Sequence, residues 1–254
     1  MPINKASNSV TSIYDAQFVM KGDEVVFGTG VYIDATGGTI SYDDGYKIHS
    51  FTTTGTGSFV VNSNSTSDLN NQVEYLIQGG GGSGARTPNA TTFASAGGAG
   101  AMRTGSYSLS SNGTFEVIVG AGGTNPGGTF YNGENGKNSS IFGITACSGS
   151  GGLVDTRGGG NCDFSGSNAG PINNGNGASN QANATDPGGA TNTTIQSGSI
   201  QDITGTPTEY GRGGIRYNQY FESGIRGAGG NGGNGSNDST VGNAGIVIVR
   251  YPFR

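Results

Sequence analysis

The chain has 254 residues, of which 52 are Gly, 31% are hydrophobic and 11% are charged. This composition argues against a highly charged disordered protein and against a conventional thick hydrophobic core. The formal net charge is −5 and the Lys and Arg residues are scattered, so the basic stripe needed for nucleic-acid binding is absent. No apolar run approaches the ~20 residues of a membrane span, so membrane insertion is not expected either.

The N-terminal part of the chain is predicted to form a separate segment, residues 1–44. Within it, apolar residues at helical spacing favour a helix over residues 3–21, whereas β-branched residues in the same window favour a strand. Both alternatives stay open. Short strands are predicted at 24–27 and 31–33, and the turn Asp43-Asp44-Gly45 is expected to end the segment.

From residue 46 onwards the apolar pattern is typical of β-strands. Strands are predicted at 46–51, 58–61, 73–77, 102–109, 114–119, 139–147 and 246–251. The first two should form one hairpin, and the pair closed by Asn112-Gly113 should form a second. We therefore expect an all-β fold over residues 45–254, an antiparallel β-sandwich or jelly-roll-like domain with glycine-rich loop excursions and little or no helix.

Glycine tracts follow or precede several of these strands, as at 79–82, 120–123 and 227–235. A Gly in regular structure costs about 0.5–1 kcal/mol relative to Ala, which sums to tens of kcal/mol here, against a net stability of about 5–15 kcal/mol. The tracts are therefore either disordered or packed so closely that no side chain fits. The strand at 246–251 ties the polar segment 148–244 at both ends, which favours close packing.

No catalytic or cofactor motif stands out, so we expect a protein that is not an enzyme and binds no cofactor or metal. Gly79, Gly81 and Gly84 match G-x-G-x-x-G, but no helix can start after them to meet a pyrophosphate. His49 is the only histidine and lies within a predicted strand, which gives no support to a catalytic triad or a histidine metal site.

The two cysteines, Cys147 and Cys162, could form a disulfide or remain free. Free thiols are the interpretation favoured for a protein assembled in a cytosol.

One segment, residues 209–222, concentrates aromatic and Arg side chains within a polar glycine tract. Such side chains are typical of surfaces that contact carbohydrate or protein, through ring stacking and directional hydrogen bonds. The alternative is that these rings form a small satellite core. The candidate receptor-binding residues are Tyr210, Arg212, Arg216, Tyr217, Tyr220 and Phe221.

A series of short motifs occurs in a fixed order, at 46–52, 73–78, 119–123, 138–143 and 245–252. Over residues 45–254 this series resembles the glycine-rich domain of bacteriophage tail fibres, adhesins and other virion proteins. The glycine segment is also similar to the polyglycine-II layers of T-even-type tail-tip adhesins, in which loops between glycine tracts contact the host receptor. Polyglycine-II tracts lack internal hydrogen bonds, so neighbouring tracts or water must satisfy their backbone.

The resemblance implies a non-enzymatic virion structural protein, namely a tail-fibre or tail-tip adhesin that binds a host surface polysaccharide or outer-membrane protein. Residues 1–44 would attach to other virion proteins, and 148–244 would face outward. A capsid decoration or knob protein, and more remotely an ice-binding protein, are the alternatives. Residues 1–5 lack an apolar signal region, so we expect production in the host cytoplasm and a virion location, on the tail fibre or the capsid surface. A homotrimer would shield strand edges, and a single chain fits equally.

Overall fold

The computed structural model describes residues 32–64, 71–88, 94–154, 198–214, 224–234 and 238–253, and the backbone of 16–21 and 24–29. In this part of the chain every regular element is a strand, so no helix there is long and apolar enough to cross a membrane. The strands are β1 (Ala16–Lys21), β2 (Glu24–Thr29), β3 (Asp34–Thr36), β4 (Thr39–Asp43), β5 (Tyr46–Phe51), β6 (Gly55–Ser63), β7 (Gln72–Gln78), β8 (Arg86–Thr87), β9 (Met102–Ser108), β10 (Gly113–Val119), β11 (Ser139–Ile141), β12 (Ile144–Ala146), β13 (Ser199–Gln201), β14 (Thr208–Tyr210), β15 (Gly233–Asn234) and β16 (Ile246–Pro252).

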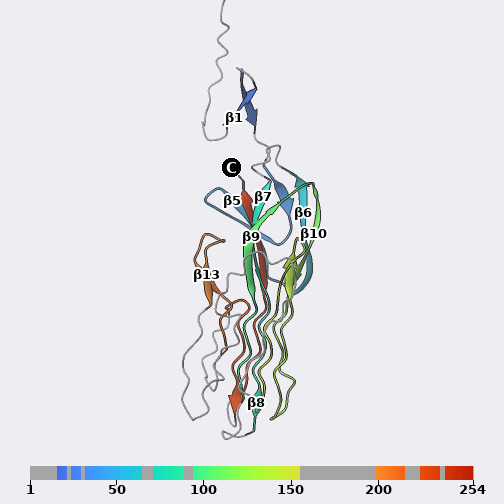
Figure 1. The fold of residues 1–254 in the computed structure, drawn as a ribbon, viewed down its shortest axis with the longest axis vertical. Helices are drawn as coiled ribbons and strands as arrows, with labels where there is room; N and C mark the ends of the chain where they lie inside the picture. The colour runs from blue at the N-terminus through green and yellow to red at the C-terminus, as the bar shows by residue number, and fades with distance from the viewer. Residues whose placement is uncertain are drawn as a thin grey trace, which may run out of the picture.

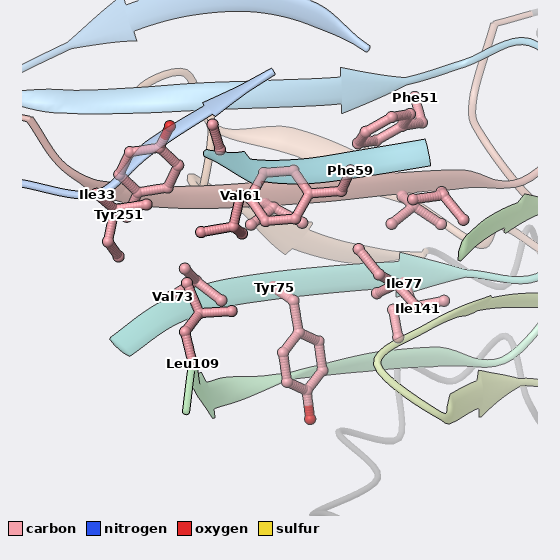
Figure 2. Close-up of a cluster of buried hydrophobic side chains, with 14 of the residues drawn as sticks. Ile33, Phe51, Phe59, Val61, Val73, Tyr75, Ile77, Leu109, Ile141 and Tyr251 are labelled. Atoms are coloured by element: carbon pink, nitrogen blue, oxygen red, sulfur yellow. The ribbon is translucent and has the colours of Figure 1, made fainter. Parts of the chain in front are cut away.

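Two five-stranded antiparallel sheets form a sandwich (Figure 1), which confirms the predicted fold class. One sheet has the order β4-β5-β16-β7-β9, and the other has the order β12-β11-β10-β6-β3. Aliphatic and aromatic side chains of both sheets meet between them, and Figure 2 shows Phe59, Val61 and Tyr251 close together in this core. The Phe59 ring is fully buried and packs edge-on against His49 and Tyr251, with ring centroids 5.1 and 6.4 Å apart.

The closing strand β16 occupies the centre of its sheet, between β5 and β7. Val249 lies opposite both His49 and Tyr75 in the two ladders. This placement confirms the prediction that the strand returns to pair with the first half of the chain. Both faces of the sheet are covered, because the β13–β14 hairpin and its turn bring Ile203 and Tyr210 onto the outer face. A strand buried on both faces has few polar positions, which explains its continuous apolar sequence.

Both predicted hairpins are wrong, because the strands of each pair lie in different sheets. β5 and β9 belong to one sheet, whereas β6 and β10 pair with each other in the opposite sheet. Neither Asn112 nor Gly113 has the positive φ of a type I′ turn. The chain crosses between the sheets at these points. Alternating patterns cannot distinguish such a crossing from a hairpin, since both bury one face of each strand. The 139–147 strand, by contrast, folds into the β11–β12 hairpin around Phe142 (φ 56°) and Gly143 (φ 73°).

The N-terminal predictions are only partly within the described residues. The helix alternative is wrong for 16–21, since these residues form β1 and pair with β2; residues 3–15 lie outside the described part. Residues 32–33 are not in a strand, although β2 matches the strand predicted at 24–27. β3 and β4 pair with β6 and β5, so these strands of the 1–44 segment are part of the sandwich. An attachment role for residues 1–44 stays a prediction.

Eight glycine-rich tracts extend from one end of the sandwich and run side by side (Figure 1). We call them together the glycine bundle. They are 79–85, 94–101, 120–124, 131–138, 147–154, 211–214, 226–233 and 239–245. Within the described residues, the bundle therefore draws on tracts between 79 and 245, and not only on the predicted 148–244 excursion.

The tract at 79–85 lies at the centre of the bundle. Its N–H groups follow a period of three: Gly79 and Gly82 both donate to the tract at 94–101, at N···O distances of 2.9 Å. Gly80 and Ser83 donate to the tract at 131–138. Gly81 and Gly84 donate to the tract at 239–245. These three neighbours all run antiparallel to the central tract.

The carbonyl groups of the central tract accept hydrogen bonds from three further neighbours. The acceptor–donor pairs are Gly81 with Gly123, Gly82 with Gly230, and Ser83 with Gly152, each at an N···O distance of 2.8 Å. The donor tracts are 120–124, 226–233 and 147–154. The central tract is thus surrounded by six others, three accepting and three donating. A three-residue period with the hydrogen bonds made between neighbouring tracts is the polyglycine-II arrangement, as the resemblance implied.

Close packing explains why the central positions are Gly. A Cβ added at Gly80, Gly81 or Gly82 would lie 2.1, 2.0 or 2.1 Å from a carbonyl oxygen of a neighbouring tract. Real Cβ atoms essentially never approach heavy atoms below 3.0 Å. The disordered alternative is therefore wrong for the described tracts. Ser83 is the exception within 79–84, and its hydroxyl donates to the carbonyl of Thr124 (2.8 Å) at the end of the adjacent tract.

An asparagine ladder joins two of the outer tracts. In the 131–138 tract, Asn side chains recur at every third position, and each Oδ1 accepts a backbone N–H of the 147–154 tract. The pairs are Asn132 with Val154 (2.8 Å), Asn135 with Gly151 (2.8 Å) and Asn138 with Ser148 (2.9 Å). The ladder gives hydrogen-bond partners to N–H groups that point away from the central tract.

Candidate binding surface at the distal end of the glycine bundle

The described tracts of the bundle offer little side-chain chemistry along their length, so the candidate binding residues among the described ones are those near the chain reversals. Three chain reversals connect described tracts at the end farthest from the sandwich, where Figure 1 shows β8, and their described residues are 86–88 and 94, 124–131, and 233–234 and 238–239. β8 pairs in parallel with β15, and Arg86 bridges to Tyr131 through backbone hydrogen bonds of 2.9 and 3.0 Å. We call this end the distal surface.

Arg86 holds the reversals together. Its guanidinium forms an ion pair with Asp238 (Nη1–Oδ1 2.7 Å) and donates to the Gly128 carbonyl (3.3 Å). The Tyr131 hydroxyl and the Ser239 hydroxyl are 2.7 Å apart, within hydrogen-bonding distance. Loops from three distant parts of the sequence are thereby fixed against one another.

The outward side chains of the distal surface combine an aromatic ring with polar groups. Phe130 is 59% exposed, and the carboxylate of Asp238 is largely exposed where it pairs with Arg86. Asn125 donates to the Ser239 carbonyl (2.8 Å). Exposed rings flanked by hydrogen-bonding groups are suited to stacking on a sugar or filling a pocket of a protein.

The candidate residues of the 209–222 segment have different positions. Tyr210 is only 3% exposed and packs in the apolar cluster on the outer face of the β16 sheet, so its ring has a packing role. Burial raises the pKa of its hydroxyl. Arg212 pairs with Glu209 (Nε–Oε1 3.0 Å), and this hydrogen bond holds the pKa of Glu209 below its usual value. Arg216, Tyr217, Tyr220 and Phe221 lie outside the described residues.

The distal residues were missed because each stands alone in the sequence. Arg86, Phe130 and Asp238 come together only through the bundle, whose hydrogen-bond register no short motif encodes. The available signal was the interruption of each glycine tract by larger side chains before the chain turns back.

Two further findings concern the chemistry of the chain. No group of three or more His, Cys, Asp or Glu side chains suited to a metal ion occurs among the described residues. Cys147 is disulfide-bonded, so the free-thiol interpretation is wrong for this residue; the other cysteine, Cys162, lies outside the described part.

Comparison with known families gives a match to the family model described as Glycine-rich domain, over residues 52–252. The chain belongs to this family. The match begins just before β6, ends in β16 and contains all eight tracts of the bundle, so the family assignment covers most of the sandwich and the whole bundle of this glycine-rich domain. None of the curated proteins compared with the chain matches it.

Proposed function

We propose that this glycine-rich domain is a phage virion protein, a tail-fibre or tail-tip adhesin, whose glycine bundle holds a host-receptor contact surface at its distal end. The observation that supports it best is the six-neighbour bundle around residues 79–85. The tracts of the bundle are held to one another by backbone hydrogen bonds, so the exposed side chains of its reversals, such as Phe130, can vary in sequence without loss of the bundle.

The proposed receptor is a surface polysaccharide or an outer-membrane protein of the host. Phe130 would supply a stacking or anchoring ring, and the exposed carboxylate of Asp238 would accept hydrogen bonds from the receptor. Such an arrangement, a central aromatic group with a polar rim, is the usual composition of a binding hot spot. The non-enzymatic character expected from the sequence stays part of this proposal.

The proposal is tested by adsorption of particles carrying Phe130→Ala together with Asp238→Ala. Both side chains are largely exposed, so the fold should survive, and we expect the adsorption rate to fall about tenfold or more. The matched control is Ile200→Ala, an exposed residue on β13 beside the sandwich. Unchanged adsorption of the double variant, with particles still assembled, would count against the distal surface.

A second set of variants separates the distal surface from the aromatic segment predicted from sequence. Alanine at Arg216, Tyr217, Tyr220 and Phe221 should reduce adsorption if that segment also contacts the receptor. Immunogold labelling of the particle locates the protein, and labelling over the capsid shell would favour the decoration-protein alternative.

A further inference from the structure

β4 is an edge strand with little of the usual protection against pairing: its one charged residue is Asp43, whose carboxylate lies against Gly205 of the β13–β14 turn. It ends its sheet, all five of its residues are exposed, and no described segment pairs with its outer side. Its sequence, Thr39 to Asp43, contains no Lys or Pro, and its register with β5 is free of bulges. Edge strands without such devices are templates for another strand.

The β4–β5 turn determines which backbone groups of β4 are free. Asp44 (φ 40°) and Gly45 (φ 81°) form a two-residue turn, so the flanking pair Asp43 and Tyr46 is hydrogen-bonded and the ladder alternates from there. The N–H and C=O groups of Ile40 and Tyr42 consequently point away from β5. The side chains of Ile40 and Tyr42 are 39% and 59% exposed, which adds an apolar contact to this edge.

A recess of about 340 Å³ adjoins this edge, at the end of the sandwich that carries the C-terminus in Figure 1. It is lined by Tyr42, Asp43, Asp44, Gly45, Tyr46 and Phe253. The Phe253 N–H donates to the Gly45 carbonyl (2.7 Å), and the Tyr42 and Phe253 ring centroids are 5.0 Å apart. These contacts fix the aromatic wall against the turn.

The charges around the recess favour a cationic occupant. Asp43 and Asp44 are exposed and form no ion pair with any described residue. The neighbouring Lys47 is already engaged, since its ammonium lies 3.5 Å from the Asp34 carboxylate, donates to the Ala35 carbonyl (2.8 Å) and lies 5.9 Å from the Phe253 ring centroid. Ammonium and guanidinium groups bind well between carboxylates and aromatic faces.

We propose that the β4 edge and this recess bind an extended basic segment of a partner protein. The segment adds as a strand to Ile40 and Tyr42, and one of its Lys or Arg side chains enters the recess. A small free cation fits less well, because the recess leaves Tyr42 mostly exposed and so cannot enclose a small ligand. A strand added to the β4 edge would cover the opening of the recess. The inference does not rest on the adhesin proposal, since this surface lies at the other end of the molecule from the distal surface.

The probe is a synthetic peptide, Ac-Val-Lys-Val-Lys-Val-Lys-amide, titrated into the isotopically labelled protein and followed by backbone amide NMR. We expect saturable shifts concentrated on β4 and on Asp44 and Phe253, weakened by added salt. The matched peptide with Glu in place of Lys should not bind. Equal shifts with both peptides, or no shifts at β4, would overturn the proposal.

Two variants test the two halves of the surface. Asp43→Asn with Asp44→Asn keeps an Asn-Gly turn and should weaken the peptide about tenfold through lost charge. Ile40→Pro removes an outward N–H, a change that edge strands accept, and should weaken the peptide at least as much. Ile200→Ala should leave the affinity unchanged. Undiminished peptide binding to both β4 variants would contradict the proposal. Self-association of the unmodified protein would also contradict it if Ile40→Pro abolished that association, because the edge would then bind a second copy of this chain.

Discussion

The sandwich and the glycine bundle are stabilised in opposite ways. In the sandwich each strand pairs with at most two neighbours, and stability comes from side chains such as Phe59 that fill the space between the sheets. In the bundle the central tract at 79–85 bonds to six neighbours, and almost no side chain lies between them. One region depends on side-chain volume, whereas the other depends on its absence.

This difference predicts opposite responses to mutation. Removing side-chain atoms should damage the sandwich and leave most of the bundle unaffected. Adding a single methyl group should damage the centre of the bundle, although the same change is harmless where a Gly faces open space. The comparison also explains why the outer tracts contain Asn, Ser and Ala, since their outward positions have room for a side chain.

Gly82→Ala should have the largest effect. Its Cβ would lie 2.1 Å from the Ser150 carbonyl oxygen and 2.7 Å from the Gly151 nitrogen, both of them backbone atoms of a packed tract. We expect a loss of about 5 kcal/mol in the free energy of unfolding, or separation of the bundle from an intact sandwich. Urea denaturation followed by circular dichroism measures it. Gly113→Ala is the control, because a Cβ there meets nothing within 4 Å; a similar loss for both would refute the packing argument.

Phe59→Ala should come next, at about 4 kcal/mol, because it leaves a cavity in the centre of the sandwich core. The ring packs against those of Phe115 and Phe142, at centroid distances of 6.4 and 6.1 Å. Phe130→Ala, at an exposed position, should change stability by less than about 0.5 kcal/mol. Thermal denaturation of both variants tests the contrast, and equal stability would show that the sheets do not depend on this core.

Asn135→Ala should have a smaller effect, about 1 kcal/mol, since it removes one rung of the asparagine ladder. The Gly151 N–H loses its partner, so its hydrogen exchange should accelerate. Asn135→Asp keeps an acceptor oxygen and should retain most of the protection. If Ala and Asp substitutions leave the exchange of Gly151 equally unchanged, the ladder has no part in stability.

His49 should give the sandwich a modest dependence on pH. The buried ring donates from Nδ1 to the Gly37 carbonyl (2.7 Å), so Nε2 accepts from the Tyr251 hydroxyl (3.0 Å). Burial lowers the pKa of His49, with Lys47 adding to the shift. Below about pH 6.5 the unfolded chain therefore binds a proton that the folded chain does not. The free energy of unfolding consequently decreases as the pH is lowered from about 6.5 towards the pKa of His49 in the folded chain.

Denaturation curves between pH 5 and 8 test this effect against His49→Gln, which does not titrate in that range. The variant should have a lower free energy of unfolding, and that free energy should no longer decrease with decreasing pH below about pH 6.5. An unchanged slope would assign the pH dependence to other groups.

Sequence reasoning predicted the elements of this protein better than their arrangement. The strand at 246–251 was predicted to return and pair because a segment with five apolar residues out of six is unfavourable in water, and β16 lies at the centre of its sheet. The two hairpins were wrong because a sandwich crossing and a hairpin have the same periodicity. Close glycine packing followed from the cost of Gly, but its centre at 79–85 could not be found, since the bonding register between tracts is a long-range property.

The aromatic segment illustrates the same limit. Tyr210 and Arg212 are among the residues predicted to bind a receptor, yet Tyr210 is buried in an apolar cluster and Arg212 is paired with Glu209. Composition indicated that aromatic side chains gather in this segment. It could not indicate which of them face the sheet, because that depends on the β13–β14 hairpin covering the outer face of the β16 sheet.

Residues 79–85 are held by six neighbouring tracts, and amide hydrogen exchange at these residues measures that directly. The N–H groups of Gly80, Gly81 and Gly82 each have a carbonyl partner in another tract at 2.9 or 3.0 Å, and all three residues are buried. We expect them to exchange as slowly as the N–H of Leu76 in the centre of β7. Exchange at the rate of an unstructured glycine chain would show that the neighbouring tracts do not hold these residues.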